Sequence, residues 1–175
     1  SGCKSNRDDP LKKLLVLGRC PKCVLRGVNL RGANLRSADL SQADLSGANL
    51  YKANLKDSIL TEANLSNGNV TGVNLSRANL NGADLRGANF SGSDLQYAKL
   101  KWAHLSGTNL NGTNLQKANL IGADLRNAKL DSTKLSGANL SEANLTETLI
   151  KKENLDMAIL CKTKTPWGED NSGCK

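Results

Sequence analysis

Aromatic residues are scarce in this chain of 175 residues, which has one Phe, two Tyr and two Trp. Ordinary globular cores draw much of their buried surface from large rings, so this core must be built differently. The single His argues against a His-rich metal site and against a Ser-His-Asp catalytic triad. No apolar run approaches the ~18 residues of a membrane span, so no membrane span is expected.

What the sequence does contain is a repeat of five residues. Every fifth residue from Leu25 to Leu160 is large and apolar, and 25 of these 28 positions hold Leu. The other three are Val70, Phe90 and Ile150. Two positions before each stands a small residue, Ala in 17 cases, and the residue between is Asn or Asp in 20. The register does not slip over residues 23–160, so the repeat defines the architecture.

A period of five fits neither a helix nor a long strand. At about 100° per residue, steps of five would scatter the leucines around a helix, and Asn is a poor helix former. Within one unit, the order small, polar, large alternates inward, outward, inward, as in a very short strand. The last two residues are typical of turns, with Gly at the second in 11 units. A short strand and a corner, repeated, predict an all-β solenoid.

The pattern A-(N/D)-L-x-x, as in "GANLRSADLSQADLSGANL", resembles the pentapeptide repeat family over residues 23–160. The resemblance implies a right-handed quadrilateral β-helix with four repeats per coil, and the 28 repeats then give about seven coils. With a period of 20, certain hydroxyls would form an inward ladder: Ser93, Thr113 and Thr133. Certain amides could bond from coil to coil: Asn29, Asn49, Asn69, Asn89 and Asn109.

Both ends of a solenoid need caps, because open β-edges template aggregation. Residues 8–18 predict a short capping helix whose leucines close one end of the core. After Leu160 a loop is expected, with Trp167 over the other end, and Glu153 and Leu149 predict an irregular last coil. We therefore divide the chain into an N-terminal tail and capping helix (1–22), the β-helix (23–160) and a disulfide-closed capping loop (161–175).

The five cysteines lie at or outside the edges of the repeat array. A disulfide between Cys161 and Cys174 would close a 14-residue loop, worth about 3 kcal/mol in the entropic treatment. Such a bond fits an oxidising compartment. The family resemblance strengthens this interpretation, because similar proteins of the cyanobacterial periplasm and the thylakoid lumen often end in a similar tail. A thylakoid lumen or a periplasm is therefore the expected location.

The other cysteines leave alternatives open. Cys20 and Cys23 form a C-x-x-C motif that could be a structural disulfide between cap and first coil, a redox dithiol or part of a zinc site. We favour the structural disulfide, because the motif ends a helix and opens the solenoid instead of opening a helix. Cys3 could be free, lipid-modified or paired between chains.

Charge bears on the partners. Some members of the family resemble a DNA duplex and protect DNA gyrase, which requires an acidic rod, whereas this chain carries a net charge of +8. Residues 23–160 hold 15 basic and 12 acidic residues, so gyrase mimicry is disfavoured. Nucleic-acid binding is also disfavoured, because it needs a continuous basic stripe that the sequence does not provide.

One surface patch is singled out as a possible site of contact with a protein partner. Tyr97 and Trp102 stand at outward corners of successive repeats, and Lys99 and His104 replace the usual Asn or Asp beside Lys101. No catalytic residue, cofactor or metal is expected, since the Asp and Ser residues recur with the repeat and a convex rod offers no deep pocket. We expect a non-catalytic interaction scaffold. The alternatives are an electrostatic binder of acidic partners or nucleic acid and a thiol-redox protein.

Overall fold

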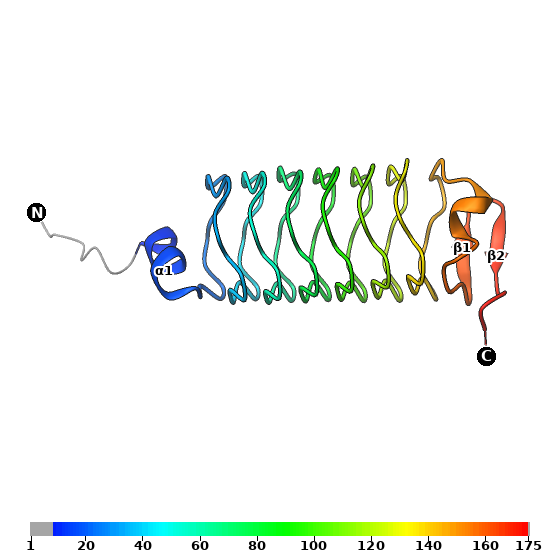
Figure 1. Cartoon of the computed structure of the whole chain (residues 1–175), viewed down its shortest axis with the longest axis horizontal. Helices are drawn as coiled ribbons and strands as arrows, with labels where there is room; N and C mark the ends of the chain where they lie inside the picture. Colours follow the sequence, from blue (N-terminus) through cyan, green and yellow to red (C-terminus); the bar gives the residue numbers. More distant parts are fainter. Residues whose placement is uncertain (1–8, 175) are drawn as a thin grey trace, which may run out of the picture.

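The computed structural model describes residues 9–174. It is a stack of coils with a helix at one end and a hairpin at the other (Figure 1). The named elements are helix α1 (Pro10–Leu17), the 3-10 helix η1 (Lys152–Leu155) and strands β1 (Thr163–Thr165) and β2 (Gly168–Asp170). Between α1 and η1 the backbone forms single-residue parallel bridges in place of long strands.

The bridges join residues that are 20 positions apart. Asn29 pairs with Asn49, Asn49 with Asn69, and three further columns follow the same spacing. Next to one bridge, the Leu30 N–H donates to the Asn49 carbonyl at 2.8 Å, and the Asn49 N–H donates to the Val28 carbonyl at 2.9 Å. Because each repeat has five residues, four repeats separate paired residues, and the expected all-β solenoid is confirmed.

The core is a column of leucines flanked by small side chains. The central residue of each repeat is buried, and Phe90 is the largest of the fully buried side chains. The small residue two positions earlier is buried as well along most of the rod, as at Ala83 and Ala88. The predicted alternation of inward and outward side chains is therefore correct, and the small positions are small because the interior has no further room.

Each corner from Leu25 to Leu145 is a turn whose second residue has a left-handed backbone. In the first corner after Leu25, the Val28 N–H donates to the Leu25 carbonyl at 3.2 Å, and the residue before Val28, Gly27, has φ of 61°. Glycine adopts this conformation without steric penalty, yet many corners use other residues, such as Gln42 at 57°. Hydrogen bonding between coils holds these corners, since the Gln42 N–H donates to the Thr61 carbonyl of the next coil at 2.9 Å.

The hydroxyls expected on one inward column, those of Ser93, Thr113 and Thr133, are buried, and each bonds to the main chain. The Thr113 hydroxyl donates to the Phe90 carbonyl at 2.8 Å, and the Thr133 hydroxyl donates to the Leu110 carbonyl at 2.9 Å. Each hydroxyl therefore reaches a corner carbonyl of the preceding coil. The expected amide contacts are present at two steps of their column, with nitrogen–oxygen distances of 3.5 and 3.1 Å.

Ser58 is the exception among the buried hydroxyls, and it gives a prediction. Its Oγ is buried with no hydrogen-bond partner among the described residues, and the same column continues with Ala78 and Ala98. We expect Ser58→Ala to raise the free energy of unfolding by about 1–2 kcal/mol, because an unpaired buried hydroxyl carries a desolvation penalty. Urea denaturation followed by circular dichroism measures the change.

Ser93→Ala is the matched control for this substitution. The Ser93 hydroxyl donates to the Val70 carbonyl at 2.6 Å and accepts the Val73 N–H at 3.2 Å. Its loss leaves buried main-chain groups with fewer partners, so the free energy of unfolding should fall by about 1–2 kcal/mol. The same sign of change for both serine variants would contradict the assignment.

Helix α1 forms the N-terminal cap. The Asp9 side chain accepts the Leu11 N–H at 3.0 Å, Pro10 stands in the first turn, and Gly18 ends the helix with φ of 64°. The expectation that its leucines close the core is only partly met. Leu14 is fully buried and Leu11 packs against the core, whereas Leu15 and Leu17 face outward.

The C-terminal end differs from the expected loop. Residues 163–170 form an antiparallel hairpin in which Thr163 pairs with Asp170. Strand β1 continues one wall of the solenoid, because Lys164 bridges to Asn144 of the preceding coil. The expected irregularity of the last coil is present, since η1 interrupts the wall and Glu153 is exposed within it. The hairpin thus pairs part of the edge that the solenoid would otherwise leave open.

Candidate functional site

The recurring Asn and Asp side chains cap the corners. In one repeat after another, Oδ1 accepts the main-chain N–H two residues later, as Asn49 does from Tyr51 at 3.1 Å. This contact closes an Asx turn. The abundant carboxylates and amides of the repeat therefore serve as structural groups of the turns.

The structure compensates where Lys replaces the capping residue. At Lys99 no side-chain oxygen is present, and the Lys101 N–H instead donates to Oδ1 of Asn81 in the preceding coil at 3.0 Å. At Lys129 the same substitution occurs, and the Asp131 N–H donates to Oδ1 of Asn111 at 3.0 Å. Sequence analysis missed this exchange. The signal in the sequence was an Asn placed 18 residues before each of these two lysines.

The patch predicted from the sequence lies on the side of the rod. All five of its side chains are exposed: Tyr97, Lys99, Lys101, Trp102 and His104. Tyr97 and Trp102 are 43% and 58% exposed and have left-handed backbones with φ of 60° and 59°. The two aromatic side chains therefore point away from the core at successive corners of one coil.

Neighbouring coils hold both aromatic rings, which sequence analysis did not foresee. The Tyr97 ring has the Arg77 guanidinium 6.0 Å and the Lys117 ammonium 5.4 Å from its centroid. These cations lie at the same corner of the preceding and following coils. The Trp102 ring covers Gly122, where an added Cβ would collide with the indole. The rings are thus fixed in direction while half of each surface stays accessible.

Charged pairs surround His104 on one wall. His104 bridges to Asp84 of the preceding coil and to Asp124 of the following coil. Hydrogen bonds from Arg86 and Arg126 lower the pKa of Asp84 and of Asp124, respectively, and the charge of His104 contributes a smaller lowering to both. Both carboxylates therefore remain ionised at neutral pH and neutralise the arginines beside them.

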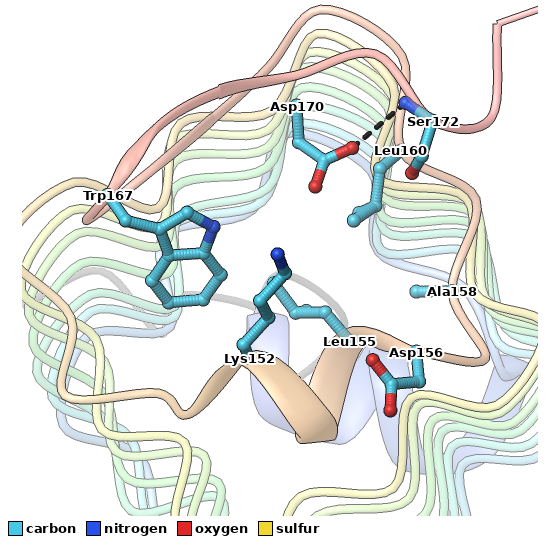
Figure 2. Close-up of a pocket in the computed structure, with 8 residues that line it drawn as sticks. All are labelled: Lys152, Leu155, Asp156, Ala158, Leu160, Trp167, Asp170 and Ser172. Carbon is cyan, nitrogen blue, oxygen red and sulfur yellow. Dashed lines mark hydrogen bonds between the residues drawn. The ribbon is translucent and has the colours of Figure 1, made fainter.

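A pocket of about 290 Å³ opens at the C-terminal end, between η1 and the hairpin (Figure 2). Leu155, Ala158 and Leu160 contribute its apolar surface, and the Lys152 ammonium points into it. The remaining lining residues are Asp156, Trp167, Asp170 and Ser172. Trp167 thus stands at the end of the core, as expected.

Two polar residues of the pocket, Asp170 and Ser172, are engaged with each other. The Asp170 carboxylate accepts the Ser172 N–H at 2.9 Å. Hydrogen bonds from the Ser172 hydroxyl and N–H lower the pKa of Asp170, and the charge of Lys152 adds a smaller lowering. Across residues 9–174 no three His, Cys, Asp or Glu side chains are grouped to hold a metal ion.

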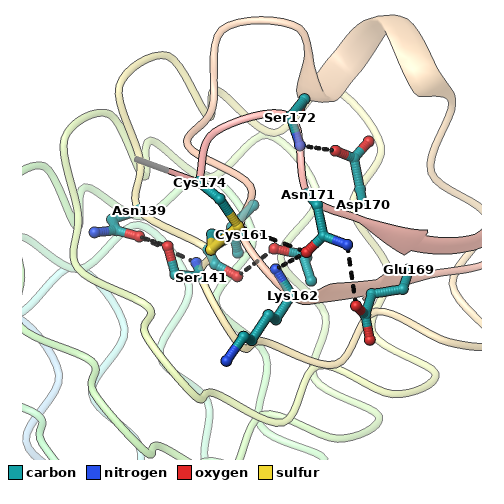
Figure 3. Close-up of a disulfide and its surroundings, with 11 residues drawn as sticks. Asn139, Ser141, Cys161, Lys162, Glu169, Asp170, Asn171, Ser172 and Cys174 are labelled. Atoms are coloured by element: carbon teal, nitrogen blue, oxygen red, sulfur yellow. Dashed lines mark hydrogen bonds between the residues drawn. A yellow bond between two sulfur atoms is a disulfide. The ribbon is translucent and has the colours of Figure 1, made fainter.

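Cys161 and Cys174 lie together at the C-terminal cap, joined as a disulfide with Cα atoms 4.7 Å apart (Figure 3). Asn171 organises the loop between them, since its Oδ1 accepts the Lys162 N–H at 2.8 Å and its amide donates to Glu169 at 3.1 Å. The Cys161 carbonyl accepts the Glu142 N–H at 2.7 Å. The tail is therefore tied to the last regular coil.

Cys20 and Cys23 are joined as a disulfide across the first corner, with Cα atoms 5.4 Å apart. The residue between them at the turn, Lys22, has φ of 59°, like the other corners. Cys20 takes a fully buried position in line with the central leucines, and its N–H donates to the Asp39 carbonyl at 2.7 Å. The repeat thus begins one unit before Cys23. Cys3 lies outside the described residues.

A sequence model of the pentapeptide repeats matches the chain in eight copies, over segments that run from residue 23 to residue 152. This chain belongs to the pentapeptide repeat family. Proteins of this family are in general structural and not catalytic, which agrees with walls whose polar groups serve the turns.

Solved structures of pentapeptide repeat proteins resemble this one. HetL, involved in heterocyst differentiation regulation in the cyanobacterium Nostoc sp. PCC 7120, is 30% identical, with 86% of this chain and 80% of HetL covered and a TM-score of 0.44. Rfr23 from the cyanobacterium Cyanothece 51142 is 29% identical, with 81% and 97% covered and a TM-score of 0.34. A protein from the Arabidopsis thaliana thylakoid lumen is 28% identical, with 66% and 70% covered and a TM-score of 0.29. A comparison with curated proteins found no match.

The pentapeptide repeat rod has few helices. Within residues 9–174, none is long and apolar enough to cross a membrane.

Proposed function

We propose that this protein is a non-catalytic scaffold that binds a protein partner through the side of the rod, at the patch formed by Tyr97, Lys99, Lys101, Trp102 and His104. The observation that carries the proposal is the fixation of two exposed aromatic rings by neighbouring coils. Aromatic side chains dominate binding energy at interfaces, and rings already held in one direction lose little conformational entropy on binding.

For this scaffold we propose a more specific architecture than an all-β solenoid. It is a right-handed quadrilateral β-helix of about seven coils. The sequence divides the chain into residues 1–22, 23–160 and 161–175, and the unit centred on Cys20 extends the β-helix toward α1. Parallel bridges between residues 20 apart support four repeats per coil. This geometry places the whole patch on one coil.

We further propose that the protein works in an oxidising compartment, a thylakoid lumen or a periplasm. The support is the disulfide geometry of four cysteines at the two caps, because disulfides persist in oxidising compartments. A thiol-redox role for the C-x-x-C pair is the weaker alternative, since Cys20 is fully buried and the half-buried Cys23 is the one sulfur of the pair open to attack by another thiol.

Electrostatic binding of acidic partners or nucleic acid is the weaker alternative. Arginines along the rod are engaged with carboxylates of the same rod, as in the pairs of Arg26 with Asp44 and Arg36 with Asp57. Such pairs interrupt any continuous basic stripe. Gyrase mimicry is disfavoured as well, since a nearly neutral array does not resemble the charge of a duplex.

The test is capture of partners from a native extract by the immobilised chain, with cross-linking to locate the contact. We expect Tyr97→Ser/Trp102→Ser to lose cross-links at the patch and to weaken capture at least ~10-fold, the scale of one aromatic hot spot. Tyr51→Ser is the matched control, because Tyr51 also contacts cations, Arg31 and Lys52, but lies in another coil. Equal capture by the double variant, shown by circular dichroism to be folded, would refute the proposal.

A further inference from the structure

The N-terminal end of the rod carries an exposed apolar surface on α1. Leu15, Val16 and Leu17 are 56%, 71% and 62% exposed, although Leu14 beside them is fully buried. Successive helical residues are about 100° apart, so Val16 lies nearly opposite Leu14 and faces away from the core. Three consecutive large apolar side chains exceed what capping requires, since capping uses Leu11 and Leu14.

Basic side chains surround this surface. Residues 9–24 contain four basic residues and one acidic residue, and all four basic side chains are exposed: Lys12, Lys13, Arg19 and Lys22. On the helix, Lys12 and Lys13 lie within about 60° of Val16, one on each side. The acidic residue, Asp9, is engaged as the helix cap.

The C-terminal end of the rod provides a contrast. It also exposes large apolar side chains, four in all: Leu149, Met157, Ile159 and Trp167. Residues 149–174, however, hold four basic and four acidic residues, so the two signs balance. Combined apolar and basic character among the described residues is thus a property of the N-terminal end. That combination is typical of segments that lie in the interface of an anionic membrane.

We propose that α1 docks the rod end-on to an anionic lipid surface, with Leu15, Val16 and Leu17 among the acyl chains and the four cations at the headgroups. The position of α1 at the tip of the rod lets a flat surface approach it without touching the coils (Figure 1). A second copy is a poorer occupant, because the basic ends of two rods repel each other. The proposal does not depend on the side patch, since the two surfaces are separate.

The test is co-sedimentation of the full chain with vesicles of phosphatidylcholine, with and without about one third phosphatidylglycerol. We expect binding to the anionic vesicles, with a partition coefficient at least ~10-fold above that for neutral vesicles. Val16→Ser/Leu17→Ser and Lys12→Gln/Lys13→Gln should each reduce binding about 10-fold. The matched controls Leu149→Ser/Met157→Ser and Lys151→Gln/Lys152→Gln should bind like the unaltered chain.

Three results would overturn the proposal. The first is no preference for anionic vesicles, or an equal loss of binding in the α1 variants and their controls. The second is a dimer in sedimentation velocity that needs Val16 and Leu17 and forms without lipid, which assigns the surface to a second copy. The third is binding to poly-glutamate without binding to vesicles, which assigns the surface to an acidic protein. Circular dichroism of each variant excludes loss of the fold.

Discussion

Replacing Leu85 by alanine is expected to lower the free energy of unfolding by about 2–5 kcal/mol. Leu85 is fully buried in the central column, and the adjoining inward positions on either side hold Ala83 and Ala88, which are fully buried too. Alanine side chains cannot extend into the space that a lost isobutyl group leaves. Because the coils are paired above and below, the wall cannot collapse onto the cavity without breaking hydrogen bonds between coils.

Leu149→Ala is the control for this effect. Leu149 takes the outward polar position of its repeat and is 94% exposed. The same substitution there should change the free energy of unfolding by less than about 0.5 kcal/mol. Urea denaturation of both variants under one set of conditions gives the comparison. Equal losses at the two positions would mean that the leucines do not form the core in the arrangement described.

Removal of the C-terminal disulfide has the second large expected effect. Cys161→Ser/Cys174→Ser should lower the free energy of unfolding by about 3 kcal/mol, because the bond closes a loop of 14 residues. Structure should be lost first at the C-terminal end of the rod. The hairpin and η1 contact the coils at one end only, so hydrogen exchange should rise in residues 161–174 before it rises in the middle of the rod.

Cys20→Ser/Cys23→Ser provides the comparison within the same chain. Its loop has only four residues, so the entropic contribution is smaller, about 2 kcal/mol. Thermal unfolding with and without a reducing agent measures both. A larger loss from the N-terminal pair than from the C-terminal pair would contradict the loop-length argument and point to strain or packing as the source of stability.

The sequence was sufficient to predict the walls of the solenoid. A strict period of five fixes which side chains face inward, because one slip would expose a leucine at each following repeat. The corners were also predictable, since Gly and Asn mark them. The inward column of Ser93, Thr113 and Thr133 was also predictable. The main-chain acceptor of each hydroxyl was not, because periodicity does not show which of several nearby acceptors a hydroxyl reaches.

The ends and the patch were less predictable, because their conformation depends on contacts outside the repeat. The hairpin depends on the pairing of Lys164 with Asn144 of the preceding coil. The Pro and Gly of the tail predicted only a turn. The residues of the patch were found from their departure from the repeat. The contacts of Tyr97 with Arg77 and Lys117 require knowledge of which residues stack at one corner.

The most direct test of the central claim, a rod closed by disulfides in an oxidising compartment, is a peptide map of the native protein. Free thiols are alkylated before digestion without reducing agent, and linked peptides are identified by mass spectrometry. The account predicts that the peptides of Cys161 and Cys174 are linked and that Cys20 and Cys23 are linked. Recovery of all four cysteines in alkylated form would contradict it and would remove the argument for an oxidising compartment.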